Sequence, residues 1–450
     1  MSFPSPTPNP NADQPPTIGS KLRPSRYLQS KQLSPTTIGV YSPFGHEFVF
    51  LATDAWKGAQ HGQTALLSPD AIKYLCDRGF LVEDGFEESV LRQYLPPPEH
   101  IREMWLVVEQ ACNMACQYCV TEGNVEDPDR RVVGRLNRKS LPIAPAQSKA
   151  VDTMSVEVAS AAISRFSEYL KVSKPPFPRV TLYGGEPLLN WPVLKAAIPQ
   201  IRSISYPGQI RENPVQALII TNGQILTEEM LEFFVEHEVA VSVSLDGRAE
   251  HHDAVRTLAS GSGTHQRAVQ TLRRYKDAGL KIGICTTIGT HNAKDLPEIA
   301  DYFADEFECA VEFQVPFQIP YNGGNKYSMP MVDAAPYALE AFERLRSRGL
   351  LEGLAGRRLY QVQHGKFHHR DCSAVGGQWV VAPDGSVGPC HALTGQRAFF
   401  KGNVLDERFD PWDNPAFHEW SRRQPVNMPD CHGCSAIAIC GGGCGTCQPE

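Results

Sequence analysis

Short apolar runs alternate with amphipathic segments along the middle of this chain. The apolar runs are typical of buried strands, and they fall at 104–109, 179–184, 217–222, 240–245, 281–288 and 311–317. Apolar positions at helical spacing predict helices between them, at 156–170, 191–201, 228–237, 265–279 and 296–307. Strand and helix alternate at roughly 35-residue spacing, which predicts right-handed βαβ units and a parallel sheet.

Six strands are too few to close an eight-stranded barrel. The pattern therefore predicts an α/β fold in which residues 100–325 form an open, partial (β/α)6 barrel. The functional site of such a sheet is expected in the loops at the carboxyl ends of its strands. A helix at 335–351 follows within a linker region, 326–371, and regular structure is expected to be sparse beyond Cys372.

The N-terminal residues follow a different pattern. Residues 1–35 are rich in Pro, Ser and Asn without an apolar period, which predicts a disordered tail. Residues 36–95 contain strand patterns at 46–52 and 64–68 and then a helix that Ser68 can cap, which together predict a small α+β domain. A polar stretch at 121–153 interrupts the barrel and is either a solvated loop or a lid over a substrate.

Composition narrows the possible partners. The chain has 42% hydrophobic and 21% charged residues, a net charge of −7 and a pI of about 6.1, so nothing in its charge attracts nucleic acid or an anionic membrane. No apolar run reaches the roughly 18 residues that span a bilayer, and the first residues do not form a secretory signal. We therefore expect a cytoplasmic protein that binds neither nucleic acid nor membrane.

Thirteen cysteines are many for a protein of a reducing compartment, where disulfides are rare. Three isolated ones are expected to be small buried side chains, namely Cys76, Cys285 and Cys309. The others are grouped at the short spacings that metal sites and clusters require. The grouped cysteines are Cys112, Cys116, Cys119, Cys372, Cys390, Cys431, Cys434, Cys440, Cys444 and Cys447.

The first group forms CNMACQYC, residues 112–119, directly after the first predicted strand. Thiolates at this spacing can hold three corners of a [4Fe–4S] cluster and leave one iron open for a ligand. The motif resembles the signature of radical S-adenosylmethionine (SAM) enzymes. The resemblance implies that the open iron binds SAM and that one electron cleaves it to a 5′-deoxyadenosyl radical, which abstracts hydrogen from the substrate. It also implies an external electron donor of the flavodoxin or ferredoxin type.

Further motifs at strand ends extend this resemblance, although each alone is typical of an ordinary turn. They are YGGEP (183–187), TNG (221–223), SLDG (244–247) and HHDAVR (251–256). The cofactor-binding residues that the resemblance implies are Tyr118, Gly184, Gly185, Glu186, Asn222, Ser244, Asp246 and Arg256. The glycines would let the backbone approach the ligand, and Glu186 would accept from the amino group of SAM. Tyr118 would pack near the adenine, Ser244 and Asp246 would lie near the ribose or carboxylate, and Arg256 would pair with the carboxylate.

Residues 372–450 resemble the SPASM extension of radical SAM enzymes, which implies two auxiliary [4Fe–4S] clusters and three clusters in all. The resemblance gives Cys372, Cys390 and Cys444 to the first auxiliary cluster, and Cys431, Cys434, Cys440 and Cys447 to the second. Many relatives have a longer gap before the last cysteine, so the division of Cys444 and Cys447 between the clusters stays open. A zinc ribbon is the alternative for these cysteines.

His391 directly follows Cys390, and the resemblance implies a catalytic base at this point. The alternative is a ring that only supports the cluster surroundings. The resemblance also implies that most SPASM enzymes modify peptides or proteins. Residues 36–95 stand where peptide maturases carry a leader-recognition domain, but only one clear helix is visible where that pattern has three. This segment is therefore either a leader-binding domain or a structural cap.

The leading functional hypothesis is a maturase of a ribosomally synthesised precursor peptide. It would remove a side-chain hydrogen and form an intramolecular carbon–carbon or thioether cross-link, with the auxiliary clusters accepting the second electron. One alternative is a sulfatase-type maturase that oxidises Cys or Ser to formylglycine. Another is a non-catalytic iron–sulfur electron carrier.

Overall fold

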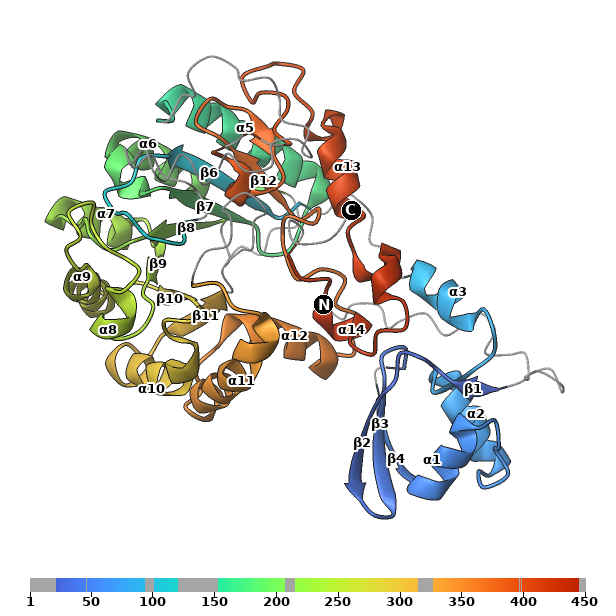
Figure 1. The fold of residues 1–450 in the computed structure, drawn as a ribbon. Helices are drawn as coiled ribbons and strands as arrows, with labels where there is room; N and C mark the ends of the chain where they lie inside the picture. Colours follow the sequence, from blue (N-terminus) through green and yellow to red (C-terminus); the bar gives the residue numbers. More distant parts are fainter. Residues whose placement is uncertain are drawn as a thin grey trace. The chain divides into compact units, whose positions relative to one another are not determined.

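The computed structural model describes residues 22–45, 47–93, 101–119, 153–206, 215–314, 327–395, 397 and 399–444. Contacts divide the chain into two compact units (Figure 1). The N-terminal unit comprises the described parts of residues 1–97 together with 357–372 and 423–444. The barrel unit comprises those of 98–356 and 373–422. No helix in the described ranges is both long and apolar enough to cross a membrane.

Six parallel strands form the centre of the barrel unit, as predicted. Their order in the sheet is their order in the chain: β6 (Glu103–Glu109), β7 (Arg179–Gly184), β8 (Gln216–Thr221), β9 (Ala240–Ser244), β10 (Ile282–Thr287) and β11 (Ala310–Gln314). The sheet does not close on itself, because β11 forms one edge. The predicted open α/β barrel is confirmed.

The sheet has eight strands rather than six. A hairpin of β12 (Gln378–Val381) and β13 (Val387–Gly388) joins its other edge, where β12 pairs in parallel with β6. In the described residues beyond Cys372 regular structure is sparse, as expected, but this strand and its place in the sheet were not predicted. All four residues of β12 are buried, so the strand shows no alternation and is too short for a periodic signal.

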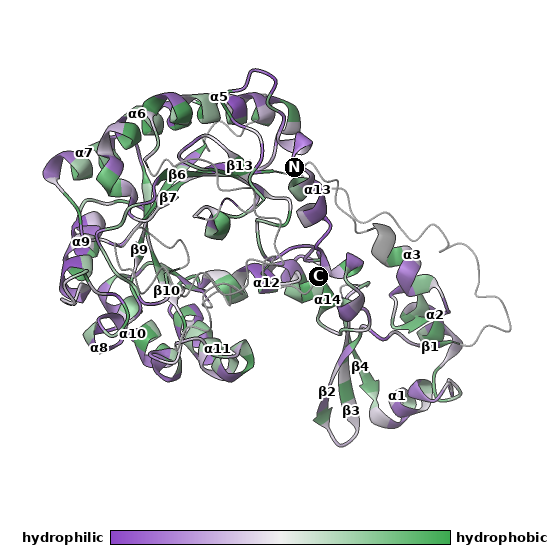
Figure 2. Ribbon diagram, turned by 45° about the horizontal axis from the view of Figure 1, so that its top comes forward, coloured by the Kyte–Doolittle hydropathy of each residue, from purple (hydrophilic) through white to green (hydrophobic). Residues whose placement is uncertain are grey.

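Helices cover the outer face of the sheet (Figures 1 and 2). They are α5 (Val156–Ser173), α6 (Trp191–Arg202), α7 (Glu228–Glu236), α8 (Ala249–His252), α9 (His265–Asp277), α10 (Leu296–Glu306) and α11 (Met331–Ser347). Local chemistry fixes their starts; for example, Ser155 accepts a 3.2 Å hydrogen bond from the Val158 amide, and Thr227 does the same for Met230. Two shorter helices, α12 (Gly353–Gln363) and α13 (Pro415–Ser421), follow later in the chain.

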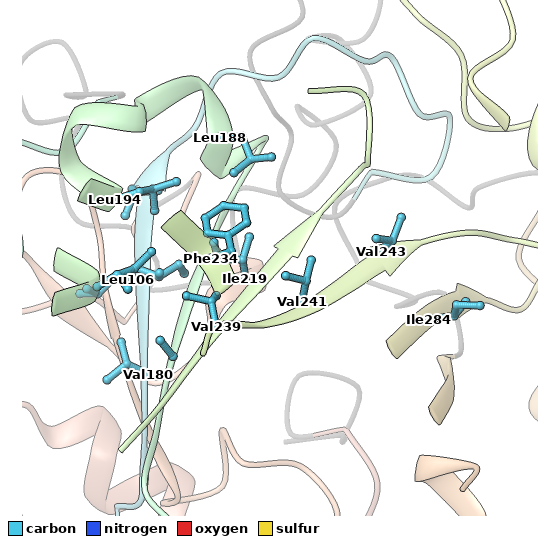
Figure 3. Close-up of a cluster of buried hydrophobic side chains, with 14 of the residues drawn as sticks. Leu106, Val180, Leu188, Leu194, Ile219, Phe234, Val239, Val241, Val243 and Ile284 are labelled. Carbon is cyan, nitrogen blue, oxygen red and sulfur yellow. The ribbon is translucent and has the colours of Figure 1, made fainter. Parts of the chain in front are cut away.

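The main core lies between the sheet and these helices. Leu106, Val180, Ile219 and Val241 belong to it, and Figure 3 shows them on adjacent strands. Successive side chains of a strand point to opposite faces, so the residues between these core positions line the inner face of the barrel. The half-buried Trp105, Tyr183, Ser244 and Cys285 are of this kind.

Among its described residues 22–93, the N-terminal unit contains a three-stranded antiparallel sheet and three helices. The strands are β2 (Gln29–Ser34), β3 (Thr37–Ser42) and β4 (Glu47–Ala52), and the helices are α1 (Thr53–Gln60), α2 (Pro69–Asp77) and α3 (Phe86–Gln93). A two-residue strand β1 (Arg23–Pro24) pairs with β5 (Leu81–Val82). Ser68 caps α2 as predicted, by accepting from the Ala71 amide.

Two predictions about this region are wrong. Residues 23–34 of the expected disordered tail form strands, and the run at 64–68 forms turns instead of a strand. The strand β2 could not be recognised from its polar sequence, QSKQLS. Four of its six side chains are exposed, and the strand is ordered only by its pairing with β3. Residues 1–21 and 121–152, which carry the rest of the tail and most of the possible lid, lie outside the described residues.

The N-terminal residues share a small core with the C-terminal cysteine loop. Tyr27, Phe367, Ile437 and Ala438 are buried together, and Cys431 packs against them. Backbone hydrogen bonds join the later segments, from the His368 amide to the Ala438 carbonyl (2.8 Å) and from the Asp371 amide to the Gly441 carbonyl (2.9 Å). The compact units therefore do not follow the linear boundaries expected at 36–95, 326–371 and 372–450.

Candidate active site

The three cysteines after β6 lie in one loop at the carboxyl end of the sheet, where the thiols of Cys116 and Cys119 act electrostatically on that of Cys112. Their loop is attached to the segment after α8 by hydrogen bonds from Ala115 N to Thr257 O (2.7 Å) and from Gln117 N to Val255 O (2.9 Å). Burial raises the pKa of the Cys112 thiol to about 12, and the neighbouring thiols of Cys119 and Cys116 contribute to the rise. Adjacent buried thiols become stable thiolates only beside positive charge, so this site fits an iron–sulfur cluster.

The two glycines of YGGEP allow this loop to lie directly against the start of the cysteine loop. A β-carbon at Gly184 would stand 1.8 Å from the Glu109 carbonyl oxygen, and one at Gly185 would stand 2.3 Å from that of Ala111. Hydrogen bonds from Gly185 N to Glu109 O (2.7 Å) and from Glu186 N to Ala111 O (3.0 Å) hold the contact. The close approach in the structure is thus to the protein's own backbone; an approach to SAM stays a prediction.

Glu186 uses its carboxylate to connect the ends of β7 and β8. It is fully buried, its Oε1 accepts from Thr221 Oγ1 (2.9 Å) and Leu188 N (3.1 Å), and its Oε2 accepts from Asn222 N (2.8 Å). Burial raises the pKa of Glu186 to about 7, although these hydrogen bonds oppose the rise. The predicted contact of this side chain with the amino group of SAM stays a prediction, since the carboxylate already has three donors.

Tyr118, Asp246 and Arg256 form one buried cluster. The Tyr118 hydroxyl and Arg256 Nε (3.0 Å) both donate to Asp246 Oδ2, and the Thr287 amide donates to Oδ1 (3.0 Å). The Arg256 guanidinium also lies 5.2 Å from the Tyr118 ring centre. Burial alone would raise the pKa of Asp246, but the charge of Arg256 lowers it, so the carboxylate is ionised. The structure confirms that these three residues lie together, whereas their contacts with SAM stay predictions.

Two histidines that the sequence reasoning missed support this cluster. His291 stacks on Tyr118 with 5.9 Å between ring centres, and its Nε2 lies 3.5 Å from Asp246 Oδ2. His252 accepts from the Asp246 amide through Nδ1 (3.3 Å) and donates to Thr264 Oγ1 through Nε2 (3.0 Å). Both follow strands of the barrel, so the rule that sites lie at strand ends could have found them.

Ser244 and Cys285 are neighbours on the inner face of the barrel, because they are paired in the β9–β10 register. Burial raises the pKa of the Cys285 thiol to about 12. Cys309 is buried in the core as predicted, while Cys285 is half-buried and faces inward. Cys285 is thus partly shielded from solvent, and it lies on the inner face of the barrel rather than in the core between the sheet and the helices.

His391 lies in an aromatic group on the inner face. Its ring stacks on Trp105 with 4.1 Å between centres and an interplanar angle of 7°. The edge of Tyr183 approaches both rings at 5.1 Å. Burial lowers the pKa of His391 to about 4, so the imidazole is neutral near pH 7 and can accept a proton. Its predicted role as a base stays a prediction.

The C-terminal cysteines are divided between the two units. Cys431, Cys434 and Cys440 lie close together in the N-terminal unit, where α14 (Ile437–Cys440) ends; burial raises the pKa of Cys431 and the other two thiols add to the rise. Cys372 and Cys444 belong to the same unit, and Cys390 is buried in the barrel unit. Cys447 lies outside the described residues, so the division of ligands between two auxiliary clusters stays a prediction.

The site thus combines an open parallel barrel with three cysteines after its first strand and a glycine-rich loop after its second. The radical SAM superfamily pattern matches residues 106–303, and the pattern of the SPASM iron–sulfur cluster-binding domain matches residues 372–435. The chain is a radical SAM enzyme with a C-terminal SPASM domain, and both domains indicate iron–sulfur clusters and SAM as cofactors. The alternatives of a non-catalytic carrier and of a zinc ribbon do not agree with these matches.

Known proteins show the same architecture. The radical SAM cyclopropyl synthase TigE of Paramaledivibacter caminithermalis is 22% identical over 393 residues, which cover 83% of this chain and 76% of TigE. The structure of anSMEcpe with bound AdoMet is similar with a TM-score of 0.62 at 20% identity, over 77% of this chain and 90% of that one. The structure of Streptococcus suis SuiB bound to S-adenosylmethionine has a TM-score of 0.55 at 13% identity, over 94% and 95% of the two chains.

Proposed function

We propose that this enzyme matures a ribosomally synthesised precursor peptide by forming an intramolecular cross-link. The observation that carries the proposal is the position of His391, whose ring stacks on Trp105 at the inner face of the barrel and which directly follows Cys390 of the SPASM domain. SuiB supports the choice of substrate class, because it has also been solved bound to its precursor peptide SuiA and resembles this chain over 94% of its length.

The chain's own residues have distinct parts in this reaction. Cys112, Cys116 and Cys119 would hold the SAM-binding cluster, and the seven cysteines from Cys372 onward would hold two auxiliary clusters. When bound, the clusters and SAM would allow one hydrogen atom to be abstracted from the substrate and one electron to be accepted from it. The second hydrogen of a cross-link leaves the substrate as a proton, and His391 Nδ1 or Nε2 would take it up. The peptide therefore loses two hydrogens for each bond formed.

The N-terminal unit is proposed to bind the leader of the precursor. Residues 22–93 of this unit contain three helices beside the three-stranded sheet, and this supports the proposal because the leader-recognition pattern has three helices, of which the sequence showed only one clearly. Both β2 and β4 are edge strands, but β2 is polar, whereas β4 presents Phe48 and Phe50, whose side chains are 63% and 70% exposed. An extended apolar peptide would add to the β4 edge and cover these rings.

The test combines purified holoenzyme, a reductant, SAM and the precursor peptide encoded beside the gene. A cross-linked product should be lighter by about 2 Da per bond, because two hydrogens are lost. Fragment spectra must show a ring, since oxidation of Ser to formylglycine removes the same mass, and borohydride would reverse only that aldehyde. A product of unchanged or greater mass would sink the proposal.

A further inference from the structure

The side chain of Asn222 extends from the end of β8 to the first cluster cysteine. Its Nδ2 lies 3.7 Å from Cys112 Sγ and donates to Asn113 Oδ1 over 2.7 Å. The Met114 amide donates to the same sulfur over 3.4 Å. Cys112 Sγ therefore receives two N–H donors, one from its own loop and one from a different strand end.

Two contacts fix Asn222 and the orientation of its side-chain amide. The backbone N–H of Asn222 donates to the buried Glu186 carboxylate (2.8 Å), which holds the residue in place. The Gln224 N–H donates to Asn222 Oδ1 over 2.9 Å. Because a backbone N–H can only donate, the atom opposite it must be the amide oxygen, and the NH₂ group must face Cys112. The two hydrogens of Nδ2 are then used by Cys112 Sγ and Asn113 Oδ1.

We propose that Asn222 is a positioning residue that raises the reduction potential of the cluster held by Cys112, Cys116 and Cys119. Reduction increases the negative charge on the cysteine sulfurs, so an N–H···S hydrogen bond stabilises the reduced cluster more than the oxidised one. Hydrogen bonds to ligand sulfurs are among the means by which a protein sets cluster potentials. The inference depends on the cluster at these cysteines and not on the peptide chemistry proposed above.

The decisive variant is Asn222→Ser in the full-length holoenzyme. A serine hydroxyl can still accept from the Gln224 amide, but it is too short to reach Cys112. A redox titration followed by electron paramagnetic resonance would measure the midpoint potential of the cluster, whose signal is recognised by its change when SAM is added. We expect the ratio of reduced to oxidised cluster at a fixed potential to fall about tenfold, which equals 59 mV for one electron.

Two further variants make the result decisive. Asn222→Leu removes the donor without adding charge and should give the same shift. Gln224→Leu is the matched control, because Gln224 Nε2 donates only to the carbonyls of Asn222 (3.3 Å) and Thr264 (3.0 Å), so the midpoint should stay at the wild-type value. An unchanged midpoint in both Asn222 variants overturns the proposal. It is also overturned if both lose about four irons per chain, because Asn222 would then be needed for assembly alone.

Discussion

The hydroxyl of Tyr118 donates a hydrogen bond to the carboxylate of Asp246, although 128 residues separate them in the chain. Tyr118 belongs to the cysteine loop and Asp246 to the loop after β9, so this bond joins the proposed cluster site to the opposite side of the barrel mouth. Arg256 donates to the same carboxylate oxygen and covers the Tyr118 ring. The cluster loop is thereby held by an ionised buried side chain.

Replacing Tyr118 by Phe should remove this bond while the ring still packs between Arg256 and His291. Hydrogen bonds to charged groups are worth about 1.5–3 kcal/mol, so the free energy of unfolding should fall by about 2 kcal/mol. SAM binding, measured by calorimetry, should weaken as the loop loosens. Tyr275→Phe is the matched control, because its buried hydroxyl has no hydrogen-bond partner among the described residues. Equal behaviour of the two variants would contradict the role given to Tyr118.

His252 should make the stability of the barrel unit depend on pH. Burial lowers its pKa from 6.5 to about 3, with the charge of Arg256 assisting and those of Asp246 and Asp253 opposing. Between about pH 3 and pH 6.5 the His252 imidazole is therefore neutral in the folded protein but protonated in the unfolded chain. Its contribution to stability is complete above pH 6.5 and is lost as the pH falls from 6.5 toward 3.

Between pH 7 and pH 5 this group should lower the free energy of unfolding by about 2 kcal/mol. The measurement is urea unfolding followed by tryptophan fluorescence at both pH values. His252→Gln should show a smaller loss than the wild type by that amount. If both proteins lose the same stability on acidification, His252 is not protected from protonation as the structure indicates.

Replacing His391 by Phe separates proton transfer from packing. A phenyl ring can still stack on Trp105 but cannot accept a proton, so cross-linked product should fall by about 10²-fold, while 5′-deoxyadenosine continues to form. Both products can be quantified by mass spectrometry in one reaction. Trp105→Phe, which keeps the imidazole, serves as the control for altered packing. Normal product formation by His391→Phe would exclude a base at this position.

Phe50→Ser should weaken binding of the precursor peptide. Burying one large apolar side chain contributes about 1.5–3 kcal/mol, so the dissociation constant should rise by about tenfold or more. Fluorescence anisotropy of a labelled precursor would measure it. Leu66→Ser provides the control, because Leu66 is 68% exposed in the same unit but belongs to the connection between α1 and α2 and not to β4. Equal effects of the two substitutions would argue against binding at the β4 edge.

The barrel could be predicted from the sequence because its local signals and its tertiary structure agree. Each strand of the predicted set is a short apolar run, and the motifs follow strand ends. The resemblance to radical SAM enzymes that these motifs carry implied that Tyr118, Asp246 and Arg256 belong to one site. Such local signals do not show with which groups a side chain forms hydrogen bonds. The motif predicts a contact of Glu186 with the ligand, and the structure adds that its carboxylate accepts from Thr221 and from the amides of Leu188 and Asn222.

Other elements could not be predicted from the sequence, because contacts with distant segments of the chain stabilise them. The polar strand β2 forms only through pairing with β3, and β12 is a four-residue run that extends the sheet at β6. His291 was missed because no motif marked it, although it follows strand β10; its stacking on Tyr118 and its position beside Asp246 assign it to the site. Sequence patterns report periodicity within a segment, whereas these features depend on contacts between segments far apart in the chain.

The core shared by Tyr27 and Ile437 also has a consequence for how the molecule is made. The side chain of Gln29 bonds to the carbonyl of Ser435, 406 residues later in the chain. At about 5–20 residues per second, a ribosome needs about 20–80 seconds to pass from one to the other. During that interval Tyr27 and Phe44 have already been synthesised, whereas the C-terminal residues of the same core, Ile437 and Ala438, have not. A chain that ends before residue 437 would leave this apolar surface exposed to solvent, and chaperones would then bind it as they bind an unfolded chain.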